Sequence, residues 1–170
     1  GYYLLFDLWL CLMPSYMLCF ASAMVMLTER DENMAGYMAV TPLGKTGYVL
    51  SRLIFPAVIA FFFSILLTYI SSLTKWNLLI LSAVSLLMSL SSAAAALMIF
   101  SFSRNKVEGM AVGKMASLIF IGIVIPFFIK SDAQYLGAFL PSFWAVKLRT
   151  GGNIMLMLPA LAVCLVWIWA

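Results

Sequence analysis

The chain has 170 residues, of which 65% are hydrophobic and only 9% are charged. A soluble domain carries about 25% charged residues, so this composition excludes a soluble globular protein and predicts an integral membrane protein. The net charge of +4 fits a surplus of Lys and Arg beside anionic lipids, and we expect no nucleic-acid partner.

Five apolar stretches follow one another along the chain. They cover about residues 3–27, 53–73, 78–102, 110–129 and 154–170. A helix that crosses a bilayer needs about 20 mostly apolar residues, and apolar runs of this length indicate helices. The sequence therefore predicts an all-α, polytopic bundle of transmembrane helices. We treat residues 1–170 as one transmembrane domain and expect it to be incomplete at both ends, since both ends consist of membrane-type sequence.

The loop between the first two spans carries most of the polar residues of the chain. Thr28 to Asp31 has the S/T-x-x-E/D form of a helix N-terminus, and Met34 and Tyr37 then fall on one helical side. Pro42 stands where the first turn of the next helix would begin. We predict a short amphipathic helix, a turn and a second helix along the membrane surface. The apolar face packs on its own bundle or docks a partner; a solvated connector is the simpler alternative.

No nucleotide or metal site is predicted in this chain. Gly44-Lys45-Thr46 looks like the end of a phosphate-binding loop, but that motif needs a glycine where Ala39 stands and a preceding strand. Histidine is absent, which disfavours a zinc centre. Asp7 is the only acid within a span. An acid in the membrane is a functional hypothesis, but a position beside Tyr2 and Trp9 favours solvated anchoring at the interface.

The third span carries a stripe of small residues with 3-4-3 spacing, which places them on one face of a helix. The stripe consists of Ser82, Ser85, Ser89 and Ser92. Small faces let helices approach closely, and hydroxyls bond across the contact. Helix packing is the simpler interpretation, and a subunit interface or the lining of a polar path is the alternative.

Basic residues suggest the orientation of the bundle. The two charged loops, 28–52 and 103–114, carry six Lys and Arg residues, and the segments on the other side carry four. This favours cytoplasmic loops and an external start of the chain. Residues 135–146, on the outer side, contain Pro141 and are too short to span yet too apolar for open water. We predict a re-entrant or interfacial segment there, or a loop packed on the bundle.

Three motifs in order resemble the membrane subunit of ABC-2 type ABC transporters. The first is Glu29-Arg30 followed by Gly36 and Thr41-Pro42-Leu43. The second is the run from Asn105 to Gly109, and the third is Pro141-Ser142-Phe143-Trp144 before the last span. The resemblance extends over all 170 residues, and it is somewhat greater to drug-export permeases, including fluoroquinolone exporters. Antimicrobial-peptide immunity permeases are nearly as similar.

The resemblance implies that the five spans are the second to sixth of six, in a bacterial cytoplasmic membrane. It implies a permease without catalytic residues, which works with a separate ATPase subunit and a second permease subunit, identical or different. ATP and Mg would be used by the ATPase. The coupling helix that docks on the ATPase would involve Glu29, Arg30, Glu32, Met34, Gly36, Tyr37 and Pro42. A second cytoplasmic motif would comprise Asn105, Glu108 and Gly109.

Two other classes of function remain open from the sequence. An ion-coupled secondary transporter usually has buried ionisable residues at mid-membrane or paired broken helices. Neither is evident, although Pro14, Pro56, Pro126 and Pro159 could break helices. A membrane scaffold or assembly protein would have a stable partner that is not an ATPase.

Overall fold

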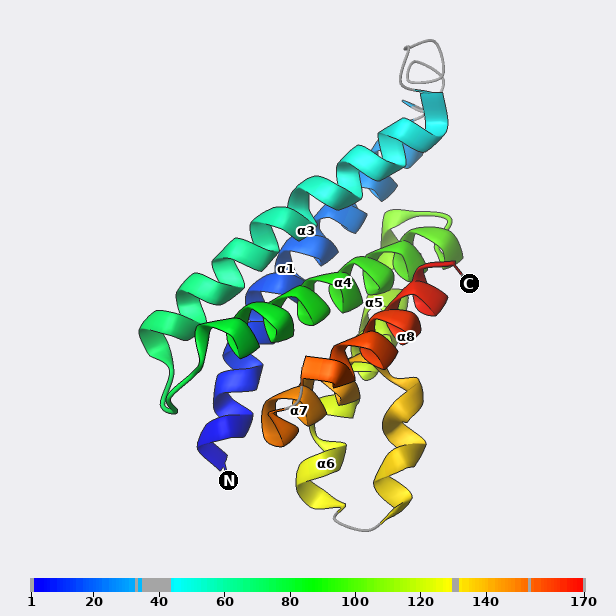
Figure 1. Cartoon of the computed structure of the whole chain (residues 1–170). Helices are drawn as coiled ribbons and strands as arrows, with labels where there is room; N and C mark the ends of the chain where they lie inside the picture. Colours follow the sequence, from blue (N-terminus) through cyan, green and yellow to red (C-terminus); the bar gives the residue numbers. More distant parts are fainter. Residues whose placement is uncertain (1, 33, 35–43, 130–131, 153, 170) are drawn as a thin grey trace.

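The computed structural model describes residues 2–32, 34, 44–129, 132–152 and 154–169, and these residues form helices without a β-strand (Figure 1). The long helices are α1 (Tyr2–Asp31), α3 (Gly44–Ser71) and α4 (Leu78–Phe102). The second half of the chain has α5 (Lys106–Ala116), the 3₁₀ helix η1 (Ser117–Ile123), α6 (Ile125–Phe128), η2 (Asp132–Phe139), α7 (Pro141–Gly151), η3 (Ile154–Leu156) and α8 (Met157–Trp169).

Within the described residues, four stretches are helical, long and apolar enough to cross a membrane, which confirms the all-α membrane class. They are Tyr2–Asp31, Gly47–Ser71, Leu78–Phe102 and Lys106–Phe128. In the fifth predicted span, 154–170, the α-helix α8 has 13 residues. The short 3₁₀ helix η3 precedes it.

The ends of the first two long helices differ from the prediction. α1 continues to Asp31, and α3 begins at Gly44 rather than at residue 53. The prediction that Thr28 starts a separate helix is wrong, because Thr28 lies in α1 and its hydroxyl donates to the Met24 carbonyl at 2.9 Å. No Gly or Pro stands near Thr28, so the helix continues past this residue to Asp31. The rest of the predicted amphipathic helix, residues 33 and 35–43, lies outside the described residues.

α1, α3 and α4 pack together around a small polar contact. The Sγ of Cys11 in α1 lies 2.9 Å from the Oγ of Ser64 in α3 and 3.5 Å from the Oγ of Ser85 in α4. The Ser64 hydroxyl also lies 2.6 Å from the Cys11 carbonyl oxygen and donates to it. All three side chains are buried. Hydrogen bonds between helices are one of the forces that hold membrane bundles together, and here one cysteine joins three helices.

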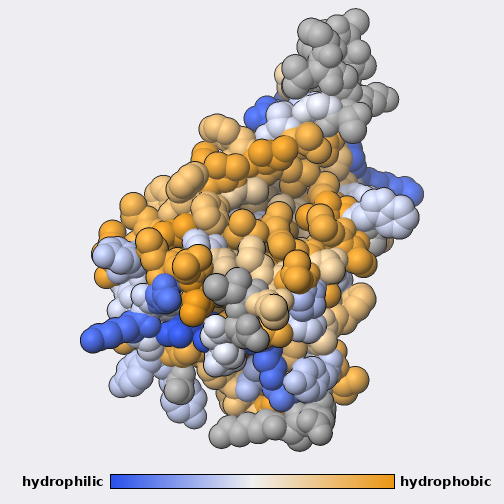
Figure 2. All heavy atoms as spheres, in the orientation of Figure 1, coloured by the Kyte–Doolittle hydropathy of each residue, from blue (hydrophilic) through white to orange (hydrophobic). Residues whose placement is uncertain are grey.

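α4 is the central helix of the bundle, and α3 lies at its edge. α4 contacts α1, α3, α5, α7 and α8. In the most apolar 18-residue stretch of each helix, 67% of α4 is buried inside the bundle but only 22% of α3. The free face of α3 carries Phe55, Phe62 and Tyr69, all exposed. Figure 2 shows hydrophobic side chains over the middle of the visible face and hydrophilic ones toward its ends, as expected of a lipid-facing surface.

The fourth span is not one continuous α-helix. It starts as α5, continues as η1 and ends as α6. The predicted span, 110–129, therefore begins one helical turn later than the observed helix, which starts at Lys106. A mid-helix stretch of 3₁₀ structure of seven residues is unusually long, because its hydrogen bonds are poorer than those of an α-helix.

η2 and α7 form a hairpin that enters the bundle and returns toward the same end (Figure 1). The Trp144 indole joins the two arms by donating to the Ala138 carbonyl at 2.7 Å. The far end of α7 reaches the α3–α4 turn, where Arg149 donates to the Lys75 carbonyl at 3.0 Å. At the tip, Leu140 packs against a buried cluster at the other half of the bundle. This arrangement agrees with the predicted re-entrant segment rather than with a loop on the bundle surface.

Gly122 permits this hairpin to approach η1. A Cβ atom at Gly122 would lie 2.9 Å from the Phe143 nitrogen and 3.1 Å from the Leu140 Cβ. We expect Gly122→Ala to lower the free energy of unfolding by about 1–3 kcal/mol, because backbone must move to make room. Gly151→Ala is the matched control, since its nearest neighbour would be the Leu156 Cδ1 at 3.4 Å. Thermal unfolding in detergent would measure both, and equal melting temperatures would contradict the close approach.

Candidate functional site: the charged end of the bundle

Charged side chains from three segments meet at one end of the bundle, which we call the charged end. It consists of the last turn of α1 with the residues directly after it, the first half of α3, and the turn between α4 and α5 with the first turn of α5. Its charged side chains within the described residues are Glu29, Arg30, Asp31, Glu32, Arg52, Arg104, Lys106 and Glu108. The described parts of the two loops that the sequence assigned to one side of the membrane therefore lie at the same end.

Arg30 joins the end of α1 to the end of α4. Its Nη1 donates to the carbonyls of Phe100 at 3.3 Å and Ser103 at 2.7 Å. Its guanidinium carbon also lies 4.0 Å from the centre of the Phe100 ring. The last carbonyls of a helix have no partner within the helix and carry partial negative charge. Arg30 satisfies two of them from a different helix, so it caps α4.

The turn between α4 and α5 is fixed by side chains of the second predicted motif. Asn105 is the N-cap of α5, and its Oδ1 accepts from the Glu108 backbone nitrogen at 2.9 Å. The Glu108 carboxylate in turn accepts from the Arg104 backbone nitrogen at 2.8 Å. Asp31 accepts from the Lys106 backbone nitrogen at 3.0 Å and so adds a second link between α1 and this turn. The motif thus forms a reciprocal cap at a helix N-terminus.

Glu29 links α1 to α3 through an ion pair with Arg52. The Glu29 side chain is 17% exposed and that of Arg52 43%, so solvent screens the pair, which is worth about 0–1 kcal/mol. Ser22 in α1 also donates its hydroxyl to the Arg52 carbonyl. The pair therefore sets the register between the two helices more than it adds stability.

Gly109 and Gly113 let α5 lie directly against α1. A Cβ on Gly109 would collide with Leu27, and one on Gly113 would collide with Phe20. The Tyr16 hydroxyl donates to the Gly113 carbonyl at 2.9 Å across the same contact. The two glycines have the G-x-x-x-G spacing of close helix pairs in membranes. Our sequence analysis used only Gly109; the spacing to Gly113 was a signal that it missed.

The residues that the resemblance assigns to ATPase docking divide into two groups. Glu29 and Arg30 point into the bundle and bind α3 and α4, as described above. Glu32 and Met34 are exposed beyond the end of α1, with Met34 39% exposed. The remaining three, Gly36, Tyr37 and Pro42, lie outside the described residues.

The serine stripe of α4 makes mostly local hydrogen bonds. Ser82, Ser89 and Ser92 each donate to a carbonyl of α4 itself, three or four residues earlier, at 2.9 Å. Ser85 instead contacts Cys11 of α1. Ser85, Ser89 and Ser92 are buried, whereas Ser82 is partly exposed. The geometry is that of helix packing; these contacts do not by themselves indicate a polar path.

Asp7 lies at the opposite end of the bundle and is fully buried. Its carboxylate accepts from the backbone nitrogens of Leu73 at 2.9 Å and Thr74 at 3.0 Å, from the Thr74 hydroxyl and from the Trp76 indole at 3.1 Å. The expectation that Asp7 is solvated is therefore wrong. Its carboxylate holds the α3–α4 turn against α1, and Arg149 of α7 covers Trp76 with its guanidinium carbon 4.4 Å from the ring centre.

Within the described residues no group of three His, Cys, Asp or Glu side chains could hold a metal ion. The cysteines Cys11, Cys19 and Cys164 are buried and unpaired with one another. The charged end thus offers backbone caps, one ion pair and exposed side chains beyond α1. Such a surface can bind another protein and transmit its movement.

Comparison with known proteins places the chain in a described family. The sequence model of a protein family described as "Fluoroquinolones export permease protein Rv2686c-like" matches residues 1–170. No curated protein and no solved structure matches the chain. The match covers the whole sequence and agrees with the apolar helices that can span a membrane. The chain is therefore a member of the Rv2686c-like family of fluoroquinolones export permease proteins.

Proposed function

We propose that the chain is the membrane-spanning subunit of an ATP-driven exporter of fluoroquinolone-type drugs in a bacterial cytoplasmic membrane. ATP and Mg²⁺ act in a separate ATPase subunit, and a second permease subunit, identical or different, completes the transporter. The permease itself supplies no catalytic residue. Membership of an export permease family supports transport, and the geometry of the charged end supports mechanical coupling to a partner.

The observation that carries the proposal is the capping of α4 by Arg30. Through Arg30 and Asp31 the end of α1 is bound to the α4–α5 turn, and through Glu29 it is bound to α3. A force applied to the loop beyond α1 would therefore reach α3, α4 and α5 together. Coupling between distant sites travels through such contiguous packed and hydrogen-bonded elements.

The docking surface would be the exposed residues beyond α1. Met34 is an exposed apolar side chain there, and Glu32 is an exposed acid beside it. An apolar centre with a charged rim is the common composition of a protein interface. The resemblance assigns Gly36, Tyr37 and Pro42 to the same contact with the ATPase.

Changing Met34 to aspartate, alone and together with Tyr37→Asp, should remove the ATPase from the complex. The reason is that a buried carboxylate without a partner at the centre of an interface costs several kcal/mol. The measurement is affinity purification of the full-length protein in mild detergent, with co-purifying proteins identified by mass spectrometry. Wild-type protein should retain a cassette ATPase in stoichiometric amount, and the double variant should retain less than about a tenth of it.

The matched control is Met155→Asp, since Met155 is an exposed methionine at the start of the last helical stretch, outside the charged end. This variant should retain the ATPase. Purification without any ATPase, under conditions that preserve a known ABC complex, would refute the proposal and favour ion-coupled transport or a scaffold. Equal loss of ATPase from both methionine variants would refute the docking surface.

A further inference from the structure

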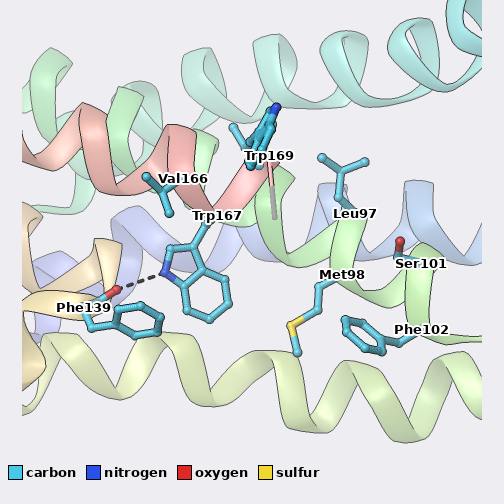
Figure 3. A pocket seen from close by; sticks show the side chains of 9 residues that line it. Leu97, Met98, Ser101, Phe102, Phe139, Val166, Trp167 and Trp169 are labelled. Carbon is cyan, nitrogen blue, oxygen red and sulfur yellow. Dashed lines mark hydrogen bonds between the residues drawn. The ribbon is translucent and has the colours of Figure 1, made fainter.

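A cavity lies between the last turns of α4, the end of η2 and the end of α8 (Figure 3). Its volume is about 470 Å³, which falls within the usual range for small-molecule sites, about 300–1,000 Å³. Met98 and Phe102 line it from α4, Phe139 from η2, and Trp167 and Trp169 from α8. The cavity belongs to none of the contacts described above for the charged end.

The lining is unusually rich in aromatic rings. Four of its nine residues are Phe or Trp, whereas aromatic residues make up 15% of the chain. A surface that only contacts lipid tails does not need aromatic rings, because leucine and valine side chains contact lipid tails equally well. Ring walls instead favour a ligand that is itself flat and aromatic, because offset or edge-to-face pairs of rings add to the burial of apolar area.

The central ring of this cavity is held in place before any ligand arrives. The Trp167 indole donates to the Phe139 carbonyl at 3.0 Å, and the two ring centres lie 5.2 Å apart at a tilt of 57° (Figure 3). The hydrogen bond crosses from α8 to the end of η2. A side chain fixed in this way loses little conformational entropy when a ligand binds.

We propose that this cavity binds the planar aromatic ring system of the exported drug. The inference rests on the proposed function for the identity of the drug and on the cavity for its place. A quinolone has a fused, flat, bicyclic core with polar groups at its edges. The core would stack on Trp167, and the hydroxyl of Ser101 is a polar side-chain group in the lining. The charged edge groups would then remain at the open side of the cavity.

The first test is binding of norfloxacin to the purified full-length protein in nanodiscs, measured by the fluorescence anisotropy of the drug. Trp167→Leu keeps an apolar side chain but removes the ring, and it should weaken binding about tenfold. Trp9→Leu is the matched control, since Trp9 is a tryptophan of α1 outside the cavity, and its affinity should equal that of the wild type. Equal affinity of Trp167→Leu and wild type would overturn the proposal, as expected if the cavity holds a lipid tail.

A second variant fills the cavity without removing any contact. Val166 lines the cavity and is 60% exposed, so Val166→Trp can be accommodated by the fold and should exclude norfloxacin. Undiminished binding to this variant would overturn the proposal even if Trp167→Leu fails to fold.

Drug accumulation in cells separates failure of the site from failure of the function. Cells that produce the wild-type protein with its ATPase should accumulate less norfloxacin than cells without them, and Trp167→Leu should make the difference clearly smaller. Export by wild type and Trp167→Leu alike would refute the site and leave the proposed function standing. Absence of export by the wild type would refute the proposed function itself.

Discussion

Replacing Asp7 with alanine should lower the free energy of unfolding by about 3 kcal/mol or more. The carboxylate accepts four hydrogen bonds from the α3–α4 turn, and all of them would be lost at once. Buried donors without an acceptor cost about 1–3 kcal/mol each. Unfolding of the purified protein in mixed detergent micelles would measure the loss. Asp7→Asn should lie between wild type and alanine, because one acceptor oxygen remains.

Asn77→Ala is the control for this prediction, because it removes a side-chain bond from the same turn. Asn77 is exposed, and its Oδ1 accepts from the Leu79 backbone nitrogen at 3.2 Å as the N-cap of α4. Loss of such a cap costs about 1 kcal/mol. If Asp7→Ala were no more destabilising than Asn77→Ala, the carboxylate would not be holding the turn.

Replacing Arg30 with methionine should abolish export while the ATPase stays bound. The change removes the two hydrogen bonds to the carbonyls at the end of α4 and the contact with Phe100, and it should cost about 3 kcal/mol of stability. The loop beyond α1 would keep its exposed residues but lose its connection to α4. Norfloxacin accumulation would be measured in cells, and co-purification of the ATPase would be measured on protein purified from the same cultures.

Arg104→Met is the matched control for Arg30. Arg104 is an exposed arginine in the α4–α5 turn, and its described contact is made by its backbone nitrogen, which methionine retains. It should export at the wild-type level. Loss of the ATPase together with export in Arg30→Met would show that Arg30 belongs to the docking surface instead of to the connection behind it.

The class of fold could be predicted from the sequence because composition alone decides it. Hydropathy located the long helices, and the apolar, proline-containing stretch around Pro141 predicted the re-entrant hairpin. Helix ends were predicted less well, because an apolar stretch read from the sequence ends at the first charged residue. The helix itself continues through Glu29 and Arg30 until Asp31, because the charged side chains find partners on neighbouring helices.

The contacts of the site were less accessible to sequence reasoning. The spacing of Gly109 and Gly113 was visible in the chain, and a search for small-residue pairs would have predicted the α1–α5 contact. The role of Asp7 was not visible, because it depends on the position of a turn almost 70 residues away. The aromatic cavity brings together three segments of chain that no local pattern connects.

The 3₁₀ helix η1 makes the fourth span longer than an α-helix with the same number of residues would be. A 3₁₀ helix rises about 2.0 Å per residue and an α-helix about 1.5 Å. Rewinding the seven residues of η1 into an α-helix would therefore shorten the span by about 3.5 Å. α5 packs on α1 at Gly113, and η1 packs on the η2–α7 hairpin at Gly122. Shortening η1 would therefore move the hairpin relative to α1 and α5. Each i→i+3 hydrogen bond of η1 would then be exchanged for an i→i+4 bond, so the backbone groups of the span would be paired before and after the change.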